Sequence, residues 1–225
     1  MRLGLAMFAL QASIGALNDV VDAPRDAGRK SGKPIPAGLV STPEAQWVAG
    51  GAGAIGIGLT AASGLVTVGL ALTVLASGCG YDLFAKGTVW SWLPFAIGIP
   101  LLPVFGWYGT TGELAPVFAL LVPVAVLTGA ALAIVNARAD LERDTAAGID
   151  SVAIRLGRHR SWRLASCLLV AVAAIALVTL LAWNAPAASI LGACAGSAII
   201  GIGIDAGRDD LPARLERAWE LQAVG

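Results

Sequence analysis

Long apolar segments run through most of this chain and restrict what it can fold into. Of its 225 residues, 57% are hydrophobic and 13% are charged, and the mean hydropathy is +0.77. These values are too apolar for a water-soluble domain of this length, and each segment approaches the about 20 residues that a membrane helix needs. We therefore predict an all-α, polytopic membrane helix bundle with about seven transmembrane helices, at residues 3–18, 45–63, 65–84, 89–107, 114–136, 161–183 and 187–204.

The charged residues between the segments predict how the bundle is oriented. If the segments cross the membrane alternately, the loops 19–44, 85–88 and 137–160 and the tail 205–225 share one face. With Arg163 counted on that face, it holds 14 of the 15 Lys and Arg residues. Cytoplasmic loops carry such an excess of basic residues. We therefore expect an integral protein of the lipid bilayer, in a bacterial cytoplasmic membrane, with these loops facing the cytoplasm.

The chain divides into one predicted membrane domain and a short tail. Residues 1–204 form the membrane-embedded domain in this prediction, and residues 205–225 form a cytoplasmic tail. In the tail, apolar residues follow one helical face among Arg and Glu, at Leu211, Leu215, Ala218 and Trp219. Such a pattern is typical of an amphipathic helix that lies on the membrane surface.

A repeated acidic motif predicts a chemical site. The pattern Asn-x3-Asp-x3-Asp occurs twice, each time at the predicted cytoplasmic end of an apolar segment, as Asn18, Asp22 and Asp26 and as Asn136, Asp140 and Asp144. Residues four apart share one face of a helix, so each copy presents its carboxylates together. Carboxylates are the ligands that Mg2+ prefers. The matching spacing predicts two related halves that meet at one divalent-metal site.

Basic residues accompany the first acidic motif. Arg25, Arg29, Lys30 and Lys33 lie within or just after it, and Asp19 adds another carboxylate. Because Mg2+ keeps waters or substrate phosphates among its ligands, this mixture suits a metal-bridged diphosphate whose outer oxygens contact the cations. The alternative is a solvated loop whose basic residues only set the topology. That alternative does not explain aspartates on one helical face at the membrane boundary.

Other patterns in the chain favour simpler interpretations. The formal net charge of zero argues against a nucleic-acid partner, which would require a basic excess. The glycines at 51, 53 and 56 match a dinucleotide-binding fingerprint, but they lie inside an apolar segment and predict helix packing, as do Gly192 and Gly196. The first segment has a second interpretation as a signal peptide cleaved near Ala16, which would leave the acidic motif at a new N-terminus.

Several of these motifs, taken in order, resemble the UbiA-type intramembrane prenyltransferases. The resemblance spans about residues 4–204. It rests on the Asn-Asp-x2-Asp-x3-Asp stretch at 18–26, the Lys-Pro-Ile-Pro-Ala-Gly run at 33–38, Tyr81 with Lys86, and Asp140-x3-Asp144 with Gly148 and Ser151. Taken alone, Tyr81 and Lys86 would be an ordinary pair at the membrane interface.

The resemblance implies a reaction and a set of site residues. In that family, the membrane helices surround a central cavity, and two aspartate-rich loops bind Mg2+ and an isoprenyl diphosphate above it. The isoprenyl group moves to a lipophilic, commonly aromatic, acceptor, as in quinone biosynthesis. By matching position, the implied metal ligands are Asp19, Asp22, Asp26, Asp140 and Asp144, of which Asp19, Asp22 and Asp140 would be catalytic. The implied diphosphate contacts are Asn18, Arg29, Lys30, Lys33, Tyr81 and Lys86.

Three departures from the family pattern keep alternatives open. Asp150 stands where many relatives carry a basic residue, and the family's helix before the first motif and its ninth helix have no counterpart among the apolar segments. One alternative is a shortened, non-catalytic membrane homologue. Another is a cation-coupled transporter, although transporters place their ion sites near the bilayer midplane and not at helix ends.

Overall fold

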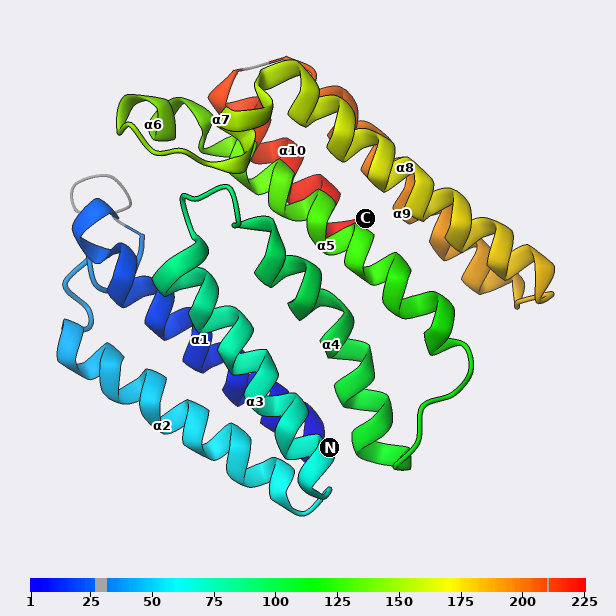
Figure 1. Ribbon diagram of the computed structural model, residues 1–225, viewed down its shortest axis with the longest axis horizontal. Helices are drawn as coiled ribbons and strands as arrows, with labels where there is room; N and C mark the ends of the chain where they lie inside the picture. The colour runs from blue at the N-terminus through cyan, green and yellow to red at the C-terminus, as the bar shows by residue number, and fades with distance from the viewer. Residues whose placement is uncertain (27–31, 210) are drawn as a thin grey trace. The chain divides into compact units, whose positions relative to one another are not determined.

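The computed structural model describes residues 1–26, 32–209 and 211–225, and their regular structure is entirely helical. It divides into two compact units (Figure 1). Unit 1 comprises Met1–Phe84 and Leu101–Phe118, and unit 2 comprises Ala85–Pro100 and Ala119–Gly225. The prediction of an all-α membrane protein is confirmed.

Six helices in the described part of the chain are long and apolar enough to cross a membrane. They are Arg2–Pro24, Leu65–Ala85, Trp92–Thr111, Phe118–Ala139, Arg158–Ala182 and Ala187–Ala206. The remaining predicted segment, 45–63, is also a helix, α2 (Thr42–Ala61). Its many glycines and the polar Glu44 and Gln46 lower its hydropathy, which explains why it is not among the six.

Unit 1 is built around α1 (Arg2–Asp26), which packs against α2 and α3 (Leu65–Gly80). The two ends of α2 lie beside opposite parts of α1, since Ser13 Oγ donates to the Ala49 carbonyl over 2.6 Å and Arg2 donates to Ser63 Oγ over 2.7 Å. Thus α1 and α2 are antiparallel. The shared core consists of Ala6, Leu10, Ala71, Val74 and Phe105, the last from α4 (Trp92–Thr111).

Glycines permit the close approach of α1 to its neighbours. A Cβ atom on Gly56 would lie 2.7 Å from Leu10 Cδ2, and one on Gly53 would lie 3.0 Å from Ser13 Oγ. Apart from its chain neighbours and the backbone of α2 itself, none of the described residues has an atom within 4 Å of the Cβ position of Gly51. Two of the three fingerprint glycines therefore serve helix packing, as the sequence predicted.

The helix α1 is longer than the predicted first segment. It has 25 residues and continues through Asp26, so the first acidic motif lies on its last turns. At about 1.5 Å per residue the helix is about 37 Å long, which exceeds the roughly 30 Å hydrocarbon core. Apolar patterning marked only the part before Asn18, because the helix continues after its apolar residues end.

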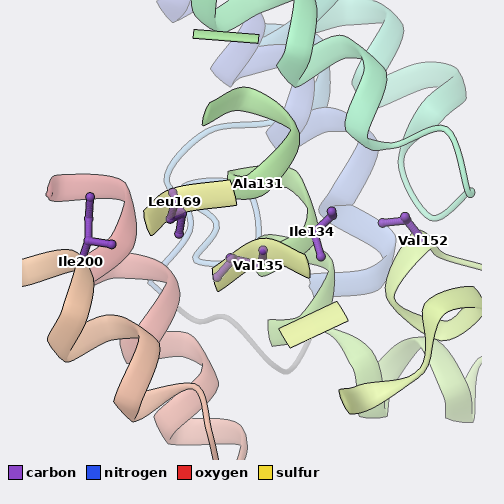
Figure 2. Close-up of a cluster of buried hydrophobic side chains, with 7 residues drawn as sticks. Ala131, Ile134, Val135, Val152, Leu169 and Ile200 are labelled. Atoms are coloured by element: carbon purple, nitrogen blue, oxygen red, sulfur yellow. The ribbon is translucent and has the colours of Figure 1, made fainter. Parts of the chain in front are cut away.

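Unit 2 contains the second acidic motif and the helices that follow it. In order its helices from Ala119 on are α5 (Phe118–Ala139), α6 (Leu141–Ala146), α7 (Val152–Leu156), α8 (Arg158–Ala182), α9 (Ala187–Ala206) and α10 (Pro212–Val224). Figure 2 shows their shared core, in which α5, α7, α8 and α9 contribute Ala131, Ile134, Val135, Val152, Leu169 and Ile200. The short helix α7 is thereby fixed to the membrane helices.

The tail helix α10 folds back along α9 (Figure 1). Leu215 and Ala218 of its predicted apolar face are buried, whereas Leu211 is exposed. A Cβ atom on Gly203 would lie 2.7 Å from Gln222 Cγ, and one on Gly196 would lie 2.6 Å from the Gly225 carbonyl oxygen. Much of the apolar face is therefore covered by protein, while its position on the membrane surface stays a prediction.

Candidate functional site

The last turns of α1 gather the carboxylates of the first acidic motif around Lys33. The Nζ atom of Lys33 lies 2.8 Å from Asp26 Oδ2, 3.2 Å from Asp19 Oδ1 and 3.4 Å from Asp22 Oδ2. Asp22 and Asp26 are buried, each with 8% exposure. Lys33, which precedes α2, therefore reaches all three carboxylates. The structure thus brings together four of the predicted site residues.

The carboxylates keep Lys33 strongly protonated. Partial burial would lower the pKa of Lys33, but hydrogen bonds to Asp26 and Asp19 and the charges of Asp22 and Asp26 outweigh it and raise the pKa above its ordinary value. Among the described residues, these three aspartates surround the one ammonium of Lys33. Carboxylates grouped in this way favour the binding of a cation.

The donor set of this cluster fits Mg2+. Among the described residues, no group of three or more His, Cys, Asp or Glu side chains is arranged to hold a metal ion as it stands. However, Mg2+ is commonly held by only one or two carboxylates, with waters and substrate phosphates completing its octahedron. Here the Lys33 ammonium stands in for a cation among hard oxygen donors. Asp22 and Asp26, on successive turns of α1, are the pair that could hold Mg2+ when Lys33 moves away.

Asn18 and Asp82 form a contact that sequence reasoning did not assign. The Asn18 Nδ2 atom donates to Asp82 Oδ1 over 2.7 Å, although the residues are 64 positions apart. Asp82 is 5% exposed and lies in η1 (Tyr81–Ala85), a π-helical turn that continues α3. Such turns are rare and often mark functional sites. The one sequence signal was an acidic residue at the end of an apolar segment.

Tyr81 and Lys86 belong to different compact units. Tyr81 begins η1 in unit 1, and Lys86 follows η1 in unit 2. Their joint role as diphosphate contacts stays a prediction. Arg29 and Lys30 lie outside the described residues, as does the side chain of Arg25.

The second acidic motif does not lie on one continuous helix. Asn136 is in the last turn of α5, Asp140 stands between α5 and α6, and Asp144 is in the first turn of α6. We expected each motif to present its carboxylates on one face of a helix. This expectation holds for the first motif only. Asp140 forms an ion pair with Arg143, so this carboxylate also has a basic side chain from its own unit as a partner.

Asp150, where the family pattern led us to expect a cation, is joined to Arg155. The Nε atom of Arg155 donates to both carboxylate oxygens of Asp150, over 2.9 and 2.8 Å. The hydrogen bond from Arg155 lowers the pKa of Asp150, and Asp150 raises the pKa of Arg155. Arg158 similarly lies 3.7 Å from Glu142. These two cations of the second loop are therefore bound to acidic partners.

Arg138 is a further residue that sequence reasoning missed. Its guanidinium is buried, with 5% exposure, and donates to the Gly207 carbonyl over 3.1 Å. This bond ties the end of α5, two residues before Asp140, to the turn between α9 and α10. A single arginine near the end of an apolar helix was the available signal.

Comparisons with known proteins agree on one family. The sequence model of the UbiA prenyltransferase family matches residues 2–221. No curated protein matches the chain. The apo structure of a UbiA homolog from Aeropyrum pernix K1 superposes with a TM-score of 0.77 at 18% identity, covering 99% of this chain and 84% of that one.

Two further solved structures share the fold. A digeranylgeranylglyceryl phosphate synthase in membranes has a TM-score of 0.69 at 16% identity, covering 99% of this chain and 80% of that one. A UbiA homolog from Archaeoglobus fulgidus, bound to GPP and Mg2+, has a TM-score of 0.67 at 16% identity, covering 99% and 88%. At these identities the likeness shows a common architecture.

Proposed function

The chain belongs to the UbiA prenyltransferase family, and we propose that it transfers an isoprenyl group from an isoprenyl diphosphate to a lipophilic, aromatic acceptor in a Mg2+-dependent reaction. The observation that carries this proposal is the convergence of Asp19, Asp22 and Asp26 on one cation at the end of α1. A homologue from Archaeoglobus fulgidus has been solved with GPP and Mg2+ and with DMAPP and Mg2+, which supports the donor class and the metal.

In this proposal the carboxylates of the chain bind the metal and its cations contact the diphosphate. When bound, Mg2+ would neutralise the negative charge that grows on the departing diphosphate. Asp22, Asp26, Asp140 and Asp144 would be its carboxylate ligands. Lys33, displaced from the carboxylates, would contact the outer diphosphate oxygens, as would Arg29, Lys30, Tyr81 and Lys86.

The transfer itself breaks one bond and forms another. The allylic carbon–oxygen bond of the donor breaks, and its electron pair leaves with the diphosphate. The electron-rich ring of the acceptor then supplies the pair for the new carbon–carbon bond and loses a proton. Apolar membrane helices would keep water away from the allylic cation. With an aromatic acceptor, the product would be a precursor for quinone biosynthesis.

The family and the apolar helices make the chain an integral membrane protein. We further propose that it lies in a bacterial cytoplasmic membrane with both acidic motifs on the cytoplasmic side. The excess of basic residues in the loops that flank them supports this orientation. A water-soluble diphosphate would then reach the motifs from the cytoplasm while the acceptor arrives through the lipid.

A transfer assay on membranes tests the proposed function. Membranes that contain the chain are incubated with Mg2+, labelled isoprenyl diphosphates of several lengths and a panel of aromatic acceptors. We expect labelled lipophilic product from the wild type, and its loss after chelation with EDTA and in both Asp22→Asn and Asp140→Asn. Asp209→Asn is the control, because Asp209 is an exposed acid that belongs to neither motif and is paired with Arg214.

The opposite results would favour the alternatives. Stable protein that gives no product across the whole panel would support a non-catalytic homologue. Product that persists in Asp140→Asn would contradict a role for the second motif, and cation-dependent solute uptake without product would support a transporter.

A further inference from the structure

Asp82 is a buried carboxylate in an apolar part of unit 1. It has 5% exposure and lies within the candidate span Leu65–Ala85. Burying a carboxylate among apolar helices is unfavourable, and such residues persist where they have a polar partner and a functional use. One of its partners is Asn18, the first residue of the acidic motif on α1.

This contact determines how the Asn18 amide is turned. A carboxylate has only acceptor atoms, so the atom of Asn18 that faces Asp82 must be the nitrogen. The hydrogen bond is short, 2.7 Å, as expected for a charged acceptor. The amide oxygen, the one atom of Asn18 able to ligate a cation, is thereby held on the side away from Asp82.

The fixed amide lies next to the carboxylates of the candidate site. Asn18 is four residues before Asp22 on α1, so both side chains leave the same helical face. Without the acceptor on Asp82, the amide could rotate and present either its oxygen or its nitrogen to a bound cation. The π-helical turn carries Asp82 at this level of α1.

We propose that Asp82 is a positioning residue that locks the Asn18 amide with its oxygen toward the Mg2+ and diphosphate site. This inference rests on the proposed function, since it assigns a role in the same site. Groups that orient a metal ligand without touching the metal commonly change metal affinity by about 10- to 100-fold when removed. Asp82 acts in this way through Asn18.

Metal binding tests this role without requiring transfer activity. The full chain in detergent is titrated with Mn2+ in the presence of inorganic diphosphate, and free Mn2+ is followed by electron paramagnetic resonance. We expect Asp82→Ala to weaken Mn2+ binding by about tenfold. Asp82→Asn keeps an acceptor oxygen at the same place and should restore most of the affinity.

A double variant separates positioning from a general structural effect. If Asp82 acts through Asn18, Asp82→Ala should weaken Mn2+ binding no further in an Asn18→Ala background. Additive losses, or an Asp82→Asn variant as weak as Asp82→Ala, would instead assign Asp82 a direct or purely electrostatic role and overturn the proposal. Thermal unfolding of each variant shows that the comparison is between folded proteins.

The two proposals fail in different ways. Wild-type protein that shows saturable Mn2+ binding with the expected Asp82 coupling, but no isoprenyl transfer, would retain the positioning role and contradict the enzyme. The reverse case is a wild type that transfers the isoprenyl group and an Asp82→Ala variant whose Mn2+ affinity and KM for the isoprenyl diphosphate are unchanged. That result would retain the enzyme and contradict the positioning role. Absence of any Mn2+ binding by the wild type would contradict both.

Discussion

Lys33 compensates the charge of the first acidic motif with a cation tethered to the same chain. Its ammonium lies within 3.4 Å of three carboxylates that we assign to Mg2+ and diphosphate. A metal ion must therefore compete with Lys33 for these oxygens, because the ammonium and the metal seek the same negative charge. The arrival of the metal would release Lys33 for the diphosphate.

This competition predicts opposite effects of one substitution on two measurements. In Lys33→Met, we expect affinity for Mn2+ without diphosphate to rise by about tenfold, since one charge-assisted competitor is lost. The KM for the isoprenyl diphosphate should rise by a similar factor, because a phosphate contact is lost. Lys33→Arg, which keeps the charge, is the control, and a fall in Mn2+ affinity of Lys33→Met would contradict the competition.

The Asp150–Arg155 pair predicts a gain of function. In Asp150→Ala, Arg155 loses its partner and becomes available to a phosphate, so the KM for the isoprenyl diphosphate should fall by about threefold, the scale of an exposed ion pair. Arg155 lowers the pKa of Asp150, and the ordinary pKa of an aspartate is already about 3.9, so the wild-type pair stays charged at neutral pH. The fall in KM should therefore be the same from about pH 6 to 8.

The control for this gain is the double variant Asp150→Ala with Arg155→Ala. It should lose the improvement, because no guanidinium is released. An equal fall in KM in the double variant would show that the negative charge of Asp150 itself, and not its hold on Arg155, opposes the diphosphate.

The carboxylates of the first motif were predictable, whereas their partners depended on tertiary structure. Spacing by four residues on a helix predicted that Asp22 and Asp26 would lie together, and they do. It could not predict Asp82, because a contact across 64 residues depends on how α3 ends and packs against α1. The break between Ala139 and Leu141 was likewise missed, since the local spacing is the same in both motifs.

At the scale of the helices, glycines set how closely neighbouring backbones approach. In unit 2, a Cβ atom on Gly129 of α5 would lie 2.3 Å from the Phe95 carbonyl oxygen of α4. A backbone atom cannot move aside as the end of a side chain can. By contrast, apart from its chain neighbours and the backbone of α9 itself, none of the described part of the chain lies within 4 Å of the Cβ position of Gly192. The expectation that Gly192 serves close packing is therefore not met by the described contacts.

These two glycines predict a matched pair of stability changes. Gly129→Ala should lower the stability of the protein by about 1 to 3 kcal/mol, because the added methyl group forces α5 away from α4. Gly192→Ala should leave stability unchanged or raise it slightly, because alanine favours a helix over glycine. Thermal unfolding in detergent measures both. Equal melting temperatures for the two variants would show that α4 and α5 do not pack as described.

For the whole molecule, composition predicted a membrane protein. The hydropathy of α2, however, is too low to place it among the six apolar helices, and the case for its crossing the membrane comes from the structure. Asn18, near the end of α1, contacts Asp82, near the end of α3, so the C-terminal ends of these helices lie at the same level. If α1 and α3 both cross the membrane in that direction, the chain must return between them. Among the described residues, the only helix between them in the chain is α2, which therefore has to cross despite its glycines and modest hydropathy.

This requirement predicts that the two ends of α2 lie on opposite sides of the membrane. In a chain whose cysteines at 79, 167 and 194 are replaced by alanine, single cysteines are placed at two exposed positions, as Leu39→Cys before α2 and Ala62→Cys after it. We expect an impermeant maleimide to label Leu39→Cys in inverted vesicles and Ala62→Cys in sealed cells, as the basic loops require. Labelling of both from one side would leave α2 at the surface. It would then place the ends of α1 and α3 on opposite sides, which the 2.7 Å bond between Asn18 and Asp82 forbids, so one of the two assignments would have to be abandoned.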